Sequence, residues 1–171
     1  PNATTDHSWY DLFAGSLSIE RNSLDYKQYP ISGRKQFLVA QYVTGTEKYM
    51  PSPITDMGSF DRKVHSWLQM KGEWEQYKTI SPYFNLGFMS ELVLSSKNLM
   101  NNYTASVLQA PAFTPTPHSQ IVFNEAFRAN QYVAFGLSPI LKFSKLLHFR
   151  LDMYGFAPLY EIKKEEVWNN N

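Results

Sequence analysis

The residues with the clearest chemical pattern lie in the stretch 147–156, near the C-terminal end of the chain. Taking every second residue gives a polar set and an apolar set: His148, Arg150, Asp152 and Tyr154, against Leu147, Phe149, Leu151 and Met153. Because side chains on a β-strand alternate between two faces, the stretch predicts a strand with one charged and one apolar face. The chemistry that this spacing favours is pairing between cations and anions.

Catalytic chemistry finds little support in the sequence. No Gly-x-Ser-x-Gly elbow is present, which excludes that lipase motif from this chain. The histidines are scattered and lack the spacing of metal ligands: His7, His65, His118 and His148. Glu73 and Glu75 share one strand face, a spacing that occurs often by chance. We therefore expect no enzyme activity from this chain by itself, and no metal or cofactor.

Composition sets further limits on the function. The 171 residues suffice for one domain, and a formal net charge of +1 gives no basic field for nucleic acid. Cysteine is absent, which excludes disulfides and thiolate metal sites. No run of about eighteen apolar residues exists, so we expect no transmembrane helix. Both ends of the chain look like cuts in a longer protein, because neither a start methionine nor a signal peptide opens it.

Alternating apolar and polar residues predict six strands. Their ranges are 9–21, 36–44, 65–77, 83–95, 132–142 and 147–156. Pro139 is expected to cause a bulge or an unpaired site in the fifth strand, because proline donates no backbone hydrogen bond. The connections 45–64 and 96–131 are long, and one helical turn is expected at 103–109. The connection 22–35 is of medium length, 78–82 is short, and the link near 144–145 is very short.

This pattern of connections predicts an all-β, antiparallel up-and-down meander. Long connections alternate with short ones and so fall at one end of the sheet, as in outer-membrane barrels. Strands of about 11 to 13 residues suit a tilted bilayer span of about 9 to 11. Six strands are fewer than the minimum of about eight for a transmembrane barrel, so further strands outside this chain are expected.

The barrel interpretation assigns the two strand faces to a lumen and to lipid. The expected lumen-facing residues are Gln69, Lys71, Glu73, Glu75, Glu91, His148, Arg150 and Tyr154. The expected lipid-facing residues are Phe84, Leu86, Phe88, Leu92, Leu94, Leu147, Phe149, Leu151 and Met153. Aromatic residues near strand ends are expected in girdles at the membrane interfaces: Trp9, Tyr10, Trp67, Trp74, Tyr77 and Tyr83. The alternative is a soluble all-β binding module with aromatic loops, in which the apolar faces are buried.

Three motifs resemble the BamA-like superfamily of outer-membrane barrels, also called bacterial surface antigens. The stretch 29–34, Tyr-Pro-Ile-Ser-Gly-Arg, is similar to the family's periplasmic-turn pattern, with Pro30 and Gly33 as its turn residues. The stretch 126–130 is similar to the Val-Arg-Gly-Phe motif of the sixth extracellular loop, although Ala129 and Asn130 replace its glycine and aromatic residue. The stretch 149–154 is similar to a strand with an inward aspartate, although Tyr154 stands where glycine is usual.

The resemblance implies that residues 1–171 belong to a single C-terminal outer-membrane β-barrel domain, with 96–131 as a long extracellular-type loop. Such a domain anchors, assembles or translocates protein. Within the superfamily, the sequence of 83–162 most resembles the barrels that follow a patatin-like phospholipase domain. Implied partners are the lipid bilayer, further barrel strands, and a fused or partner lipase domain or a secreted polypeptide. The resemblance also implies that Arg128 folds back to Asp152 and locks the long loop in the lumen. The alternative is a solvated Arg128, with Asp152 paired sideways to Arg150 or His148.

Overall fold

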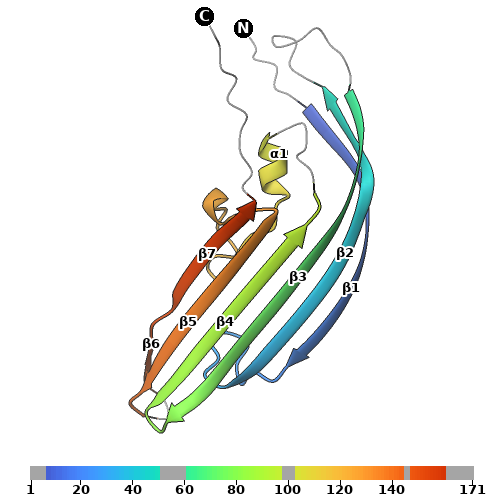
Figure 1. The fold of residues 1–171 in the computed structure, drawn as a ribbon. Helices are drawn as coiled ribbons and strands as arrows, with labels where there is room; N and C mark the ends of the chain where they lie inside the picture. Colours follow the sequence, from blue (N-terminus) through green and yellow to red (C-terminus); the bar gives the residue numbers. More distant parts are fainter. Residues whose placement is uncertain (1–6, 51–60, 98–102, 145–146, 161–171) are drawn as a thin grey trace, which may run out of the picture.

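The computed structural model describes residues 7–50, 61–97, 103–144 and 147–160. They form one antiparallel meander of strands, all in a single sheet (Figure 1). The strands are β1 (His7–Asn22), β2 (Gly33–Met50), β3 (Asp61–Ser81), β4 (Phe84–Ser95), β5 (Gln131–Lys142), β6 (His148–Arg150) and β7 (Met153–Tyr160). Two short helices, α1 (Tyr103–Leu108) and the 3-10 helix η1 (Glu125–Phe127), lie in the long connection between β4 and β5. The predicted all-β meander is therefore confirmed.

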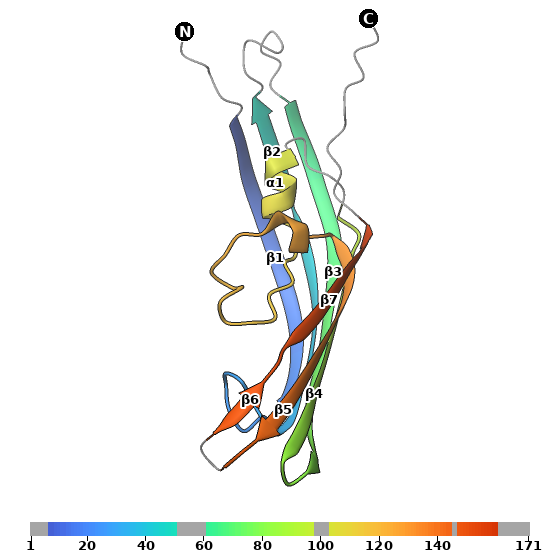
Figure 2. The ribbon, with the colours of Figure 1, turned by 90° about the vertical axis from the view of Figure 1, so that its left-hand side faces the viewer.

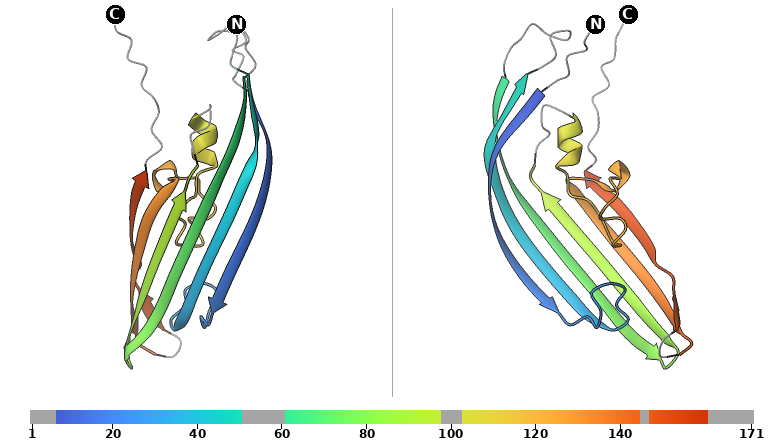
Figure 3. Two further views of the ribbon diagram at one scale, coloured as in Figure 1. Left: turned by 45° about the vertical axis from the view of Figure 1, so that its right-hand side comes forward. Right: turned by 180° about the vertical axis from the view of Figure 1, so that it is seen from behind.

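The sheet is curved and remains open. Each strand pairs with the next along the chain, and β5 pairs with both β6 and β7. Within the described ranges, β1 forms one edge of the sheet and β6 with β7 forms the other, so the sheet does not close into a barrel. The long connection, with α1 and η1, lies over the concave face (Figures 2 and 3). We call this concave side the inner face and the convex side the outer face.

β6 and β7 are one strand that is interrupted at Leu151 and Asp152. The pairings before and after the interruption keep the same register on β5. The interruption lies opposite Pro139, which has no backbone N–H to donate, whereas its carbonyl oxygen still accepts from the Leu151 nitrogen at 3.1 Å. The expected unpaired site at Pro139 is confirmed, and it explains why six predicted strands appear as seven.

The strands β2 and β3 extend farthest beyond the ranges that the sequence pattern predicts. The range 45–64 was expected to be a loop, but β2 runs to Met50 and β3 begins at Asp61. The residues 45–50 continue the pairing with β1, and 61–64 continue the pairing with β2. Cross-strand hydrogen bonds thus outweigh the weak local pattern of these polar residues, and residues 51–60 lie outside the described ranges.

The outer face carries large apolar side chains that are exposed, and no other described element covers them. Phe13 and Leu17 in β1 are each 74% exposed, and Phe135 in β5 is 52% exposed. Apolar residues at alternate positions continue across the sheet, for example Leu38, Leu92, Leu94, Leu137 and Phe149. The buried apolar residues instead gather on the inner face, where Phe113 of the long connection packs among aromatic rings of β5 and β7.

Among the described residues, no helix has both the length and the apolar character needed to cross a membrane.

Candidate functional site

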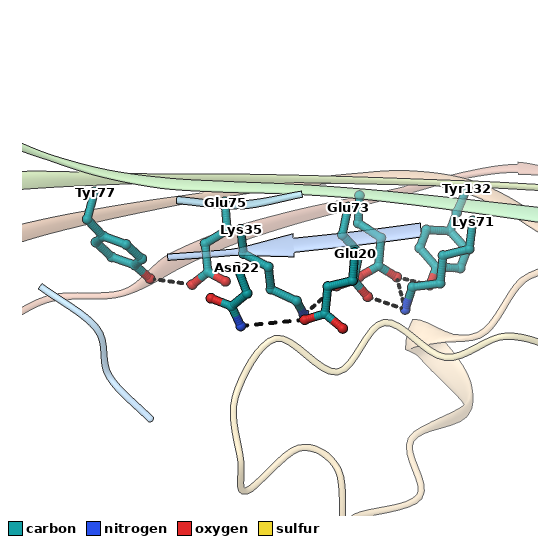
Figure 4. Close-up of polar contacts among 9 residues, drawn as sticks. Glu20, Asn22, Lys35, Lys71, Glu73, Glu75, Tyr77 and Tyr132 are labelled. Atoms are coloured by element: carbon teal, nitrogen blue, oxygen red, sulfur yellow. Dashed lines mark hydrogen bonds and ion pairs between the residues drawn. The ribbon is translucent and has the colours of Figure 1, made fainter. Parts of the chain in front are cut away.

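A row of paired charges crosses the inner face from β2 to β4. The ammonium group of Lys35 donates to Glu73 at 2.9 Å, and that of Lys71 lies 2.9 Å from Glu73 and 3.1 Å from Glu91 (Figure 4). Tyr132 on β5 extends the row by donating its hydroxyl hydrogen to Glu91. Because partly buried charges lose hydration, each gains from an opposite charge within ion-pair distance. The row ties four adjacent strands together through side chains.

A second cluster is organised around Arg150. Its Nε donates to Asp152 Oδ1 at 2.7 Å, and its Nη2 donates to the hydroxyl of Tyr77 at 2.9 Å. Its Nη1 donates to the backbone carbonyl of Pro30 at 2.8 Å, in the turn between β1 and β2. The guanidinium also lies over the rings of Tyr29 and Tyr77, at 5.6 and 5.1 Å from their centroids. One side chain therefore joins β3, β6 and the turn between β1 and β2.

That turn, residues 23–32, is held in shape by hydrogen bonds of its own, in addition to its contact with Arg150. The carboxylate of Asp25 accepts backbone hydrogen bonds from Tyr26, Ile31 and Ser32. Gly33 has φ of 100° and closes the turn so tightly that a Cβ there would lie 2.1 Å from the Ser23 carbonyl oxygen. The side chain of Asn85 in β4 then donates to the Ile31 carbonyl at 2.7 Å.

The predicted turn residues Pro30 and Gly33 thus belong to a preorganised loop that docks onto the inner face. Pro30 is buried there, under Arg150.

The long connection covers the other end of the inner face. Phe113 is 3% exposed and contacts the rings of Tyr132, Tyr154 and Phe156. Arg128 holds the connection together, because its Nη1 donates to the carbonyls of Leu108 and Ala110 at 2.9 and 3.0 Å. The long connection is therefore fixed by aromatic packing and by its own backbone.

The predicted lock between Arg128 and Asp152 is not formed among the described residues. Arg128 satisfies carbonyls of its own loop and lies over the ring of Phe123, whereas Asp152 accepts from Arg150 and Ser138. The alternative pairing of Asp152 with Arg150 is the one observed. The physical reason is proximity: Arg150 lies two residues away on the same strand face, so the pair forms without ordering a long loop.

The other predicted site residues divide between the two faces as follows. On the inner face, half-buried or buried, lie Gln69, Lys71, Glu73, Glu75, Glu91, Arg150 and Tyr154. His148 is exposed at the end of β6, where no element covers it. The predicted lipid-facing residues that are exposed on the outer face are Phe88, Leu92, Leu94, Leu147, Phe149, Leu151 and Met153. Phe84 and Leu86, which were also predicted to face lipid, are half-buried and not exposed.

Three aromatic residues expected in interfacial girdles lie inside instead. Trp67 and Tyr77 are each 7% exposed, and Tyr10 packs against Trp67 and Val43. The hydroxyl of Tyr10 donates to the buried Glu47, whose other oxygen lies 2.7 Å from His65 Nε2.

Trp9, Trp74 and Tyr83 are exposed, as a girdle requires. Strand parity could have separated the two groups, because Trp67 and Tyr77 share the face of Lys71 and Glu73.

Sequence reasoning missed several members of the polar site. Lys35, Ser138 and Asn85 all bind partners on the inner face. Lys35 falls within the predicted connection 22–35, because the residues at the start of β2 do not alternate between apolar and polar. Asn85 and Ser138 do share strand parity with Glu91 and Tyr132, which is the signal that could have found them.

A polar cavity of about 350 Å³ lies between the two loops on the inner face. Its walls come from the turn at Lys27–Pro30, from the long connection at Thr114–Pro117, and from the charged residues of the strands. Cations and anions both line it: Lys35, Lys71, Glu73 and Glu91 are paired with one another, and Glu75 accepts from the Tyr77 hydroxyl. The arrangement therefore suits a hydrated interior and does not select ions of one sign.

One glycine makes the Arg150 cluster sensitive to a single methyl group. A Cβ at position 87 would lie 2.3 Å from Cε1 of Tyr77 and 3.0 Å from Cβ of Ser138. We expect Gly87→Ala to displace the tyrosine ring from Arg150 and to lower the free energy of unfolding by about 1–3 kcal/mol. Equilibrium denaturation measures this. Gly15→Ala is the control, because nothing lies within 4 Å of a Cβ there. Equal losses of stability in the two variants would contradict the predicted crowding.

In comparisons with known proteins, no family model, no curated protein and no solved structure matches the chain.

Proposed function

We propose that this chain is part of a transmembrane β-barrel in the outer membrane of a Gram-negative-type cell envelope. In this role it contacts the bilayer through its outer face and keeps a hydrated, charge-paired interior on its inner face. The observation that carries the proposal is the outer face itself: alternate residues of adjacent strands present large apolar side chains, with Phe13 and Leu17 74% exposed. A soluble protein rarely leaves so continuous an apolar surface in water.

The two unpaired sheet edges support the same proposal. β1 is 16 residues long and β7 is 8, and each has a neighbour on one side only within the described residues. Unpaired backbone groups cannot remain at membrane depth, because hydrocarbon offers no hydrogen-bond partner. Further strands outside this chain therefore complete the sheet, and the inner face with its two loops becomes the lumen.

The barrel serves to anchor, assemble or translocate protein, as the motif resemblance implies. The turn 23–32 and the long connection both lie over the inner face, with a polar cavity of about 350 Å³ between them. Loops that occupy part of the lumen support anchoring or assembly more than free diffusion of solutes. A fused or partner patatin-like lipase domain, or a secreted polypeptide, is the corresponding cargo. The chain itself contributes no catalytic group to that reaction.

Spin labelling tests the proposal directly, because the chain has no cysteine of its own. Single cysteines are introduced at Leu92 and Leu137 on the outer face, and at Gln69 and Ser138 on the inner face. The protein is reconstituted in phosphatidylcholine vesicles, and each nitroxide is exposed to oxygen, which is soluble in lipid, and to a water-soluble nickel chelate. We expect the outer sites to collide mainly with oxygen, and the inner sites to have a lower ratio of oxygen collisions to nickel-chelate collisions. Outer sites that respond mainly to the nickel chelate would favour the soluble binding module.

A further inference from the structure

Lys97, two residues beyond β4, is a buried cation without a compensating anion. It is 7% exposed, and its Nζ lies 5.2 Å from the ring centroid of Trp67 and 3.4 Å from Gln109 Oε1. Among the described residues no carboxylate lies within ion-pair distance of it. Lys71 and Arg150, by contrast, have carboxylates at 2.9 and 2.7 Å. Burial alone lowers the pKa of Lys97 to about 8, so its charge is held at a cost in free energy.

A pocket of about 500 Å³ adjoins this lysine at the ends of β4 and β5. Its lining residues within the described ranges supply two cations, hydroxyls and amides but no carboxylate: Lys63, Ser95, Ser96, Lys97, Asn130, Gln131 and Tyr160. Asn130 is 2% exposed and its Oδ1 has no hydrogen-bond partner. Rotating that amide by half a turn presents its N–H donors at the same place. The pocket therefore combines an uncompensated positive charge with a buried polar group that lacks a partner.

We propose that this pocket binds a phosphate group, carried by a small phosphorylated solute or by a lipid headgroup. Two lysines match the charge of a phosphate dianion, and its several oxygens can accept from an ammonium group, an amide and a hydroxyl together. The polar cavity of the inner face lacks this character, because the carboxylates of Glu73, Glu75 and Glu91 line it beside its cations. The phosphate site depends on the pocket and not on a bilayer, so it stands apart from the proposed function.

Binding of phosphate at this pocket should change the fluorescence of the adjacent Trp67. The long 3.4 Å bond to Gln109 and the contact with Trp67 are weak, so an anion draws the Lys97 ammonium group away from the indole ring. Fluorescence of Trp67 therefore reports the event once the other tryptophans are replaced by Trp9→Phe, Trp74→Phe and Trp168→Phe. Affinity falls as the pH rises through the pKa of Lys97, because the neutral amine no longer attracts an anion.

The experiment titrates this variant with sodium phosphate at pH 7, against sodium chloride at equal ionic strength. We expect a saturable fluorescence change with phosphate only. Isothermal titration calorimetry, which does not need Lys97 as the reporter, should show binding about tenfold weaker in Lys97→Met, because this variant loses the charged hydrogen bond. Lys97→Arg keeps the charge and retains binding. Far-UV circular dichroism confirms folding, which Lys97→Met preserves because it removes an uncompensated charge. A phosphate response that is unchanged in Lys97→Met would overturn the phosphate site.

Two further ligands identify the source of the phosphate. Glycerol 3-phosphate carries the headgroup chemistry without acyl chains, and short-chain phosphatidic acid presents it in neutral detergent micelles. Binding of inorganic phosphate and glycerol 3-phosphate supports a soluble ligand, whereas binding of phosphatidic acid alone supports a lipid headgroup. The proposal fails if none of the three ligands binds in a manner that depends on Lys97.

Discussion

Replacing Arg150 with methionine is expected to destabilise the sheet by about 3–5 kcal/mol and to release the turn at residues 23–32. Methionine keeps the apolar stem of the side chain and removes the guanidinium. Asp152, whose side chain is only 19% exposed, then retains the hydroxyl of Ser138 but loses its positive partner. The carbonyl of Pro30 and the hydroxyl of Tyr77 lose a donor at the same time.

The turn provides its own readout, because Lys27 lies within it. Trypsin should cut after Lys27 markedly faster in Arg150→Met, while chemical denaturation measures the loss of stability. His148→Met is the matched control on the same strand, since His148 is exposed. If cleavage at Lys27 and the denaturation midpoint matched those of this control, Arg150 would not hold the turn.

An arginine introduced on the outer face should lower the free energy of unfolding by an amount that depends on how deep in the bilayer it lies. Phe135 lies in the middle of β5 and is 52% exposed, whereas Leu141 lies near its end and is 45% exposed. In a bilayer we expect Phe135→Arg to cost about 2–4 kcal/mol, and Leu141→Arg to cost about 0–1 kcal/mol. The reason is that an ion near the midplane of the bilayer lies farthest from water.

Reversible urea unfolding from phosphatidylcholine vesicles measures both values. The two positions are similarly exposed and lie on the same face of the same strand, so they differ mainly in distance from the strand end. In water, arginine at either exposed position changes stability by less than about 0.5 kcal/mol. Equal and small effects in vesicles would therefore argue against contact between the outer face and lipid.

The alternation of residue types determined the fold class and, for most strand residues, the face of the sheet on which the side chain lies. Lys71, Glu73 and Glu75 share one face because side chains repeat every second residue, and that rule needs no tertiary information. The same rule assigned Phe149 and Leu151 to the opposite, exposed face. It failed to extend β2 beyond Thr44, because strand length there depends on hydrogen bonds to β1 and β3, which a local pattern does not record.

The partners of charged groups were decided only by the tertiary structure. The sequence places Asp152 near an arginine, but which arginine it binds depends on the path of a long loop and on the register of β5 with β6. Asp152 pairs with Arg150 and not with Arg128, because the strand already positions Arg150 beside it. Arg128 instead donates to carbonyls of its own loop. Likewise, the isolation of Lys97 emerges only when distant strands and loops surround it. Periodicity fixes the face on which a side chain lies, whereas long-range folding fixes what it meets there.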